Sequence, residues 1–437
     1  MKRAAMVMAM VGICARASAQ SPPVSLTLGE AIARGMQASH RLAELGAREE
    51  AARAAEDAGR AAAGPQLALL AGYTRTNHVD EFGVPAPNGP LRVIYPDVPD
   101  NYRSRIDLQW PIYTAGRPAA LTRAAGAEAD AVAQDRVTAG ADLKLDITRA
   151  YWAVITTRAS AAVLQEALGR IGAHLTDVQN QLNVGLVPPS DLLSVEAQQA
   201  RQRMLLIEAQ NIVSTVEADL RRLVGLPPDT PIEPADRLES PPPSPEGSVA
   251  LVDAALTNRS ERKALEIRIA AAGERSTAAE AGRHPVVAAA GGYDLAHPNP
   301  RIFPRQADWK PSWDVGLNVS WSLWDGGRVQ ADLAQAEANR RAAEQRLEDF
   351  DSTVEVDVRQ RAADLVSAQA SIVAAEEAVR SAAEARRVIS ERFSVGVATS
   401  TDALDAQVAL LQAELDRTRA LANARLAAAR LDRALGR

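Results

Sequence analysis

Two acidic residues three positions apart, Asp402 and Asp405, share one face of any helix that contains them. Two carboxylates on one face form a local concentration of negative charge, which attracts cations and repels anions. The spacing by itself favours a simpler interpretation, in which both are solvated first-turn acids stabilised by the helix dipole. Which role Asp402 and Asp405 have depends on the helices and strands that position them.

The other chemistry-bearing residues show no catalytic or metal-binding arrangement. The five histidines are scattered, and none has metal-ligand spacing: His40, His78, His174, His284 and His297. The sequence also has no phosphate-binding loop. We therefore expect a protein that is not an enzyme and that carries no cofactor or metal.

The first 19 residues have the composition of a secretory signal peptide. Lys2 and Arg3 precede an apolar stretch over 4–15, and small residues over 17–19 form a cleavage site. The single cysteine, Cys14, lies inside this segment, and a lipoprotein cysteine is the alternative interpretation. Ile13 is a poor residue before such a site, but lipid attachment stays open. The signal predicts an exported protein.

Net charge and hydropathy narrow the class further. The formal net charge is −6, and removal of the signal would take away three basic residues and no acidic ones, leaving −9. This negative charge excludes a broad nucleic-acid role. No later stretch approaches the roughly 18–20 apolar residues of a membrane helix. A chain of this kind that enters a membrane must do so as strands.

The chain contains the same unit twice. Residues 106–225 align without a gap on 317–436, with Trp110 on Trp321, Gly185 on Gly396 and Asp191 on Asp402. A period this long indicates a duplicated domain rather than a solenoid. We expect a first repeat over 20–225, a proline-rich linker over 226–248 and a second repeat over 249–437.

Four segments have the pattern of short strands: 66–75, 104–113, 286–294 and 312–323. From Trp313 to Leu323 apolar and small polar residues alternate without a miss. Twelve of the 16 aromatic residues lie in 73–113 and 293–324, as in the aromatic girdles of outer membrane barrels. A soluble sandwich is the alternative, but four strands suffice neither for a sandwich nor for a closed barrel of about eight. Three copies would supply 12 strands.

The remaining segments are predicted to be helices over 28–63, 117–183 and 190–224 in the first repeat. Between Leu143 and Leu182 apolar residues recur at steps of four and three, which is a coiled-coil pattern. The 67 residues of 117–183 would make a helix about 100 Å long. The two flanking helices, laid end to end, would match its length. The alternative is an ordinary two-stranded coiled coil. The four predicted β-strands argue against it.

Taken together, the sequence resembles the TolC family of outer membrane efflux proteins over essentially the whole mature chain. Order, duplication and linker all match, and the most specific segments are "LNVGLVPPSDLL", "FSVGVATSTDALDAQ", "PIYTAGR" and "SLWDGGR". The resemblance implies a mainly α fold with a small transmembrane β part. A homotrimer would form a 12-stranded β-barrel in outer membrane lipid, continued by a long α-helical barrel across the periplasm.

The resemblance also implies roles for particular residues. The helix-helix turns would be tips on which a periplasmic adaptor protein docks, through Val184, Gly185, Leu186, Val395, Gly396 and Val397. Asp402 and Asp405 would be pore-gate carboxylates, opposed by Asp191 and Ser190. Ser190 and Thr401 also have the residue types of helix N-caps. The membrane-interface aromatics would be Trp110, Tyr113, Trp313, Trp321 and Trp324.

The chain departs from the family pattern at two positions of the gate. Phe393 and Ala398 stand where the family's best-studied pattern has a tyrosine and an arginine, so the closed state would be held differently here. The function implied is a passive exit duct served by an adaptor and an inner-membrane pump of the RND, MFS or ABC type. The alternatives are a duct for type I protein secretion and a periplasmic coiled-coil structural protein without a pore.

Overall fold

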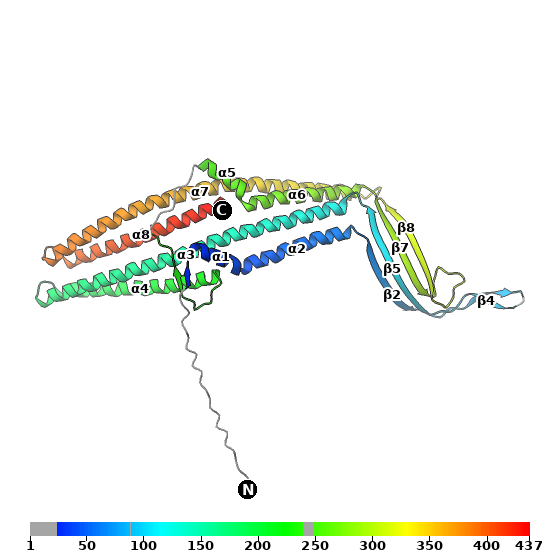
Figure 1. Cartoon of the computed structure of the whole chain (residues 1–437), viewed down its shortest axis with the longest axis horizontal. Coiled ribbons are helices and arrows are strands. Elements are labelled where there is room, and N and C mark those ends of the chain that lie inside the picture. Colours follow the sequence, from blue (N-terminus) through cyan, green and yellow to red (C-terminus); the bar gives the residue numbers. More distant parts are fainter. Residues whose placement is uncertain (1–23, 88, 239–247) are drawn as a thin grey trace, which may run out of the picture. The chain divides into compact units, whose positions relative to one another are not determined.

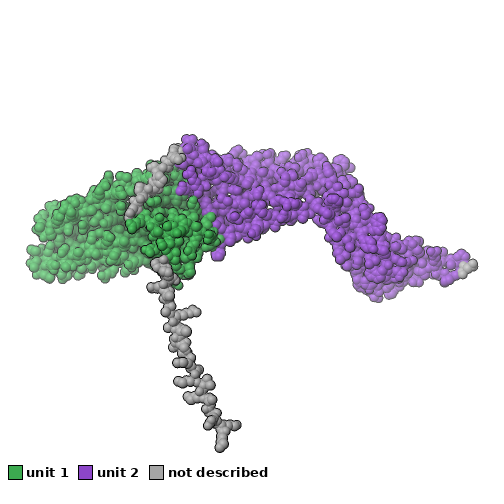
Figure 2. Space-filling view, viewed as in Figure 1, with its two compact units in different colours: residues 1–39, 143–245, 361–431 green, residues 40–142, 246–360, 432–437 purple. Residues whose placement is uncertain are grey.

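The computed structural model describes residues 24–87, 89–238 and 248–437, which form two compact units (Figure 2). We call residues 1–39, 143–245 and 361–431 the helical unit, and residues 40–142, 246–360 and 432–437 the sheet unit. The expected signal peptide, Cys14 and positions 239–247 of the expected linker lie outside the described residues. Among the described helices, none is long and apolar enough to cross a membrane.

The sheet unit contains a four-stranded antiparallel sheet in the order β2-β5-β7-β8 (Figure 1). Its strands are β2 Gln66–Arg75, β5 Asp100–Tyr113, β7 Val286–His297 and β8 Lys310–Ser320. β8 ends three residues before the expected boundary, because its register partner for Ser320 is Val286, the first residue of β7. Trp321 instead donates its indole N–H to the carbonyl of Arg283 (3.1 Å).

A second, smaller β structure lies between β2 and β5, where the sequence predicts no strand. Strands β3 Phe82–Ala86 and β4 Gly89–Tyr95 pair antiparallel, with two register irregularities. Pro85 and Pro90 interrupt the alternation of this segment, so its sequence is typical of a loop even though the backbone pairs.

Two pairs of long helices account for nearly half of the chain. α3 Arg117–Asn183 and α7 Arg328–Ser394 contain 67 residues each, and α4 Pro189–Leu223 and α8 Ser400–Ala434 contain 35 each. The helix expected over 28–63 is two helices, α1 Leu28–Ala38 and α2 His40–Ala62, because Ser39 adopts an extended backbone. In the second repeat α5 Ser248–Asn258, α6 Ser260–Glu280 and the 3-10 turn η1 Ala281–Arg283 precede β7.

The core of the helical unit lies along the apolar stripe of α3. Ile147, Val154, Ile171 and Val178 from the coiled-coil pattern are at most 2% exposed, so the periodicity located the core correctly. Two further strands, β1 Val24–Leu26 and β6 Ile232–Pro234, pair in parallel. The hydroxyl of the fully buried Tyr151 on α3 donates to Asp236, just beyond β6 (2.7 Å).

Candidate functional sites at the hairpin turns and the sheet

The two helix-helix turns have the same backbone geometry. Gly185 and Gly396 have φ values of 76° and 75°, in the left-handed region that favours glycine. In the first turn the amides of Gly185 and Leu186 donate to the carbonyls of Leu182 and Gln181 (both 2.9 Å). The second turn repeats both bonds, so each long helix ends in a Schellman motif. A Cβ at either glycine would meet open space, so the requirement is conformational.

The side chains beside these glycines are apolar and exposed. Val184, Leu186, Val395 and Val397 have exposed fractions of 63–74%. Large apolar side chains that gather at an exposed turn are typical of an interaction surface. The structure therefore places all six predicted tip residues on accessible turns, three in each.

Asp402 caps the helix in which it lies. Its carboxylate accepts hydrogen bonds from the backbone amide (2.9 Å) and hydroxyl (2.7 Å) of Thr399, and its own amide donates to that hydroxyl (3.1 Å). This reciprocal pair is a capping box, and these bonds lower the pKa of the Asp402 carboxyl. The expected N-cap Thr401 is thus wrong: α8 begins at Ser400, so Thr399 holds the capping position.

The other three predicted gate residues differ in their surroundings. Asp405 is exposed, and the described part of the chain offers it no hydrogen bond or ion pair. Ser190 lies within the first turn of α4, whose N-cap position is Pro188 without a side-chain bond, so Ser190 is not the N-cap. Its hydroxyl lies 3.4 Å from the half-buried Asp191 carboxylate. Within one copy, no bond between described residues joins Ser190 or Asp191 to Asp402 or Asp405.

Phe393, at the position where the gate pattern departs, is a core residue. It is 5% exposed and packs in one cluster with Ile171, Val178, Val195 and Ala403, against which Ala398 also packs. The buried His174 ring stands edge-on to Phe393, with centroids 4.9 Å apart. Its Nε2 lies 3.2 Å from the Ser400 hydroxyl, and burial lowers the pKa of His174. Sequence reasoning missed this histidine, because His174 directly precedes Leu175 and lies outside the regular apolar steps of four and three.

One face of the sheet is apolar and exposed. In β8 the side chains of Trp313, Val315, Leu317 and Val319 are 68–78% exposed. Register places Leu317 beside Ala289, and Tyr293 between Ile106 and Trp313, so the apolar face continues across the sheet. The predicted interface aromatics are 45–73% exposed: Trp110, Tyr113, Trp313, Trp321 and Trp324.

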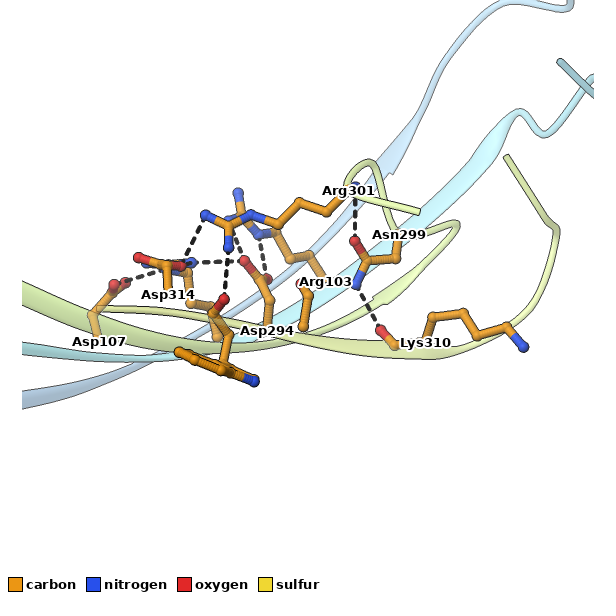
Figure 3. Close-up of polar contacts among 10 residues, drawn as sticks. Arg103, Asp107, Asp294, Asn299, Arg301, Lys310 and Asp314 are labelled. Atoms are coloured by element: carbon orange, nitrogen blue, oxygen red, sulfur yellow. Dashed lines mark hydrogen bonds and ion pairs between the residues drawn. The ribbon is translucent and has the colours of Figure 1, made fainter. Parts of the chain in front are cut away.

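The other face of the sheet carries a network of ion pairs (Figure 3). The Arg105 guanidinium contacts the carboxylates of Asp107 (2.7 Å), Asp294 (2.8 Å) and Asp314 (2.9 Å). Arg103 also binds Asp294 (2.6 Å), and Arg301 from the β7–β8 loop binds Asp314 (3.0 Å). One face is thus suited to lipid and the other to water.

These features define the class of protein. A sheet with one apolar and one charged face, joined to long helical hairpins, is the architecture of an outer membrane channel, and the chain is a channel protein rather than an enzyme. A model of the family described as outer membrane efflux protein matches residues 32–226 and 251–437. The chain belongs to this family, and its location is the outer membrane, with an extension into the periplasm.

Individual relatives agree with this assignment. Outer membrane protein TolC of Vibrio cholerae is 24% identical over 91% of this chain and 87% of its own. Protein CyaE of Bordetella pertussis is 27% identical over 69% of this chain, and the match spans only 64% of that relative's length. Among solved structures, outer membrane protein VceC of Vibrio cholerae has a TM-score of 0.77 at 21% identity, covering 94% of this chain and 96% of its own.

Proposed function

We propose that this chain is the outer membrane subunit of a tripartite efflux system and forms a passive exit duct from periplasm to exterior. Three copies would build a 12-stranded barrel. An inner-membrane pump of the RND, MFS or ABC type would deliver the substrate through a periplasmic adaptor. Family membership argues against the alternative of a periplasmic structural protein without a pore.

The observation that carries this proposal is the open sheet. β2 and β8 are its two outer strands, and each leaves one row of backbone groups without a partner in the sheet. Because all three strand pairs are antiparallel, β2 and β8 run in opposite directions. β8 of one copy can therefore pair antiparallel with β2 of the next. Closure removes the edges that a bilayer does not tolerate.

Two substitutions at neighbouring positions test the assignment of the faces. Leu317→Asp places a carboxylate on the apolar face, where a charge costs up to about 2–4 kcal/mol at the bilayer midplane. Asn318→Asp introduces the same group on the charged face. We expect the first variant to fail to insert and the second to insert normally, measured by outer membrane fractionation. Equal insertion of the two variants would contradict the assignment.

Oligomeric state and conductance test the duct itself. In detergent the protein should have three times the mass of the mature chain by light scattering, and it should form ion-conducting pores in planar bilayers. A monomer without conductance would overturn the proposal. The identity of a pump encoded beside the gene distinguishes efflux from type I secretion, because an ABC transporter next to a large repeat-rich protein favours secretion.

We further propose that Asp402 and Asp405 form the cation-attracting ring of the pore gate, with Asp191 and Ser190 on the opposing hairpin. The exposed position of Asp405 at the second turn of α8 supports this role, because its charge has no partner within the described part of its own chain. Phe393 and Ala398 contribute apolar packing beneath the turn. In this chain the closed state would therefore be held by packing rather than by a hydrogen-bonded latch.

The tips are proposed to dock the hairpin of the adaptor. Because Gly185 and Gly396 are required by their positive φ, a bulky substitution at either would strain the turn as well as block docking. Leu186→Asp with Val397→Asp is a sharper change, since both side chains are exposed and the turn backbone keeps its glycines. We expect loss of efflux with normal membrane insertion. Exposed Val366→Asp on α7 provides a control away from the turns, and efflux that survives the tip change would place docking elsewhere.

A further inference from the structure

Three arginines lie where adjacent strands of the sheet meet helices. Arg117 begins α3 just after β5, Arg283 ends η1 just before β7, and Arg328 begins α7 after β8. Since β5, β7 and β8 are neighbours, these positions share one end of the sheet. The Arg283 guanidinium donates to the Gln330 amide oxygen (2.6 Å), which holds it beside the first turn of α7. We call these three residues the arginine cluster.

The charges of the arginine cluster are not neutralised by ion pairs. All three residues are exposed, and none forms an ion pair with a carboxylate of the described residues. The acidic residue nearest in sequence to Arg328 is Asp325, whose carboxylate is occupied by the backbone amides of Gly327 (2.9 Å) and Val329 (2.8 Å). Arg328 therefore forms no hydrogen bond with the Asp325 carboxylate and acts on it only through the attraction of opposite charges.

The three arginines of strands β2 and β5 behave differently. Arg75 is paired with Asp100 (3.2 Å), Arg103 with Asp294 (2.6 Å), and Arg105 with three carboxylates. The arginines of the four-stranded sheet are thus neutralised by carboxylates, whereas those of the arginine cluster remain available for an external anion.

Exposed apolar side chains lie beside the cluster. Beyond the end of β8, Trp321, Leu323 and Trp324 are 57%, 81% and 73% exposed, and Tyr113 at the end of β5 is 49% exposed. Tryptophan and tyrosine prefer the headgroup level of a bilayer, where one edge of the ring is apolar and the other hydrated. The junction therefore combines unpaired guanidinium groups with interfacial aromatic rings.

We propose that the arginine cluster binds the phosphodiester headgroup of an anionic glycerophospholipid in the leaflet that faces the periplasm. The leaflet follows from the helices, which begin at the cluster and extend into the periplasm. Guanidinium groups bind phosphate oxygens in a bidentate manner, which suits this headgroup better than a single ammonium would. Trp321, Leu323 and Trp324 contact the glycerol and upper acyl region of the same lipid. The headgroup is recognised by side-chain charge, because Asp325 already caps α7.

Native mass spectrometry of the purified full chain tests this binding directly, with phosphatidylglycerol and phosphatidylethanolamine as probes. The variant combines Arg117→Gln, Arg283→Gln and Arg328→Gln. A matched control removes three exposed arginines of the water-facing helices: Arg48→Gln, Arg340→Gln and Arg359→Gln. We expect the wild type and control to retain phosphatidylglycerol preferentially. The cluster variant should lose this preference by roughly fivefold for each guanidinium removed. Equal preference in variant and control would overturn the proposal.

A second measurement locates the lipid and does not depend on the triple variant folding. Brominated phosphatidylglycerol should quench the tryptophan fluorescence of the wild type more than brominated phosphatidylethanolamine does. Trp321→Phe with Trp324→Phe should remove most of that difference. If the difference persists, the lipid lies elsewhere or a neighbouring copy covers these rings, and the proposal fails. Conductance is expected to stay normal in all variants, so failure here leaves the proposed channel function untouched.

Discussion

The contributions of the two proposed gate carboxylates can be distinguished by one pair of isosteric substitutions, Asp402→Asn and Asp405→Asn. Both remove one negative charge per chain, hence three per pore. Asp402 also accepts two hydrogen bonds from Thr399, whereas Asp405 has no bond in the described part of the chain. The two variants therefore share the electrostatic change and differ in the helix cap.

The two effects have different magnitudes. In water, a carboxylate about 8 Å from an ion contributes about 0.5 kcal/mol, so three contribute about 1.5 kcal/mol before salt screening. This corresponds to roughly a tenfold change in cation enrichment at low ionic strength, and it decreases as the Debye length falls. The weakened cap and helix-dipole interaction at Asp402 cost about 1 kcal/mol of helix stability. Asp405→Asn should change stability by less than about 0.5 kcal/mol.

Reversal potentials in planar bilayers measure the selectivity, and hydrogen exchange of the first turn of α8 measures the cap. We expect both variants to lose cation preference to a similar extent, and only Asp402→Asn to accelerate exchange. If neither variant alters the reversal potential, the carboxylates do not line the pore. If only Asp402→Asn alters it, the effect is transmitted through the helix start rather than by charge, and the ring model is refuted.

Three further substitutions test the packing and the ion pairs. Burial lowers the pKa of His174, so the folded state binds fewer protons than the unfolded state in acid. The neutral His174 ring therefore contributes to the free energy of unfolding above about pH 6.5. This contribution is lost as the pH falls, by up to about 1.4 kcal/mol per pH unit. His174→Leu should abolish this acid-dependent loosening, measured by hydrogen exchange at pH 7.5 and 5. Arg105→Leu leaves the 6%-exposed Asp294 with Arg103 as its one arginine partner and should lower the midpoint of thermal unfolding. Tyr151→Phe removes the hydroxyl that donates to Asp236 (2.7 Å), which keeps the Leu28 amide as a donor (2.9 Å), and should cost about 1 kcal/mol in the same assay.

Local periodicity predicted the elements that dominate the fold. The helix expected over 117–183 is α3, because an apolar residue at every third or fourth position leaves one stripe to bury along its length. The strand expected over 66–75 is β2, although its small residues gave a weaker alternation than that of β8. Both patterns are properties of neighbouring residues, which a single sequence contains.

The features that the sequence did not predict depend on distant partners or on a choice between similar residues. β1 and β6 are three residues each and pair across more than 200 positions, so neither carries a pattern of its own. The break at Ser39 was missed for lack of a proline or glycine signal there. At the second turn the segment "ATSTD" offers three hydroxyl residues, and only the structure shows that Thr399 rather than Thr401 caps α8.

The two hairpins show how a duplicated unit can diverge in chemistry while its backbone is kept. Gly185 and Gly396 differ by one degree in φ, and both turns make the same two backbone hydrogen bonds. Yet α8 begins with a capping box in which Asp402 takes part, whereas α4 begins at Pro189 without a side-chain cap. The N-cap residue of α4 is Pro188, which has neither an amide N–H nor a hydroxyl to donate, so Asp191 is released from the capping role that its counterpart performs. The cost of removing Asp191 should therefore lie in its charge, whereas the cost of removing Asp402 includes the start of its helix.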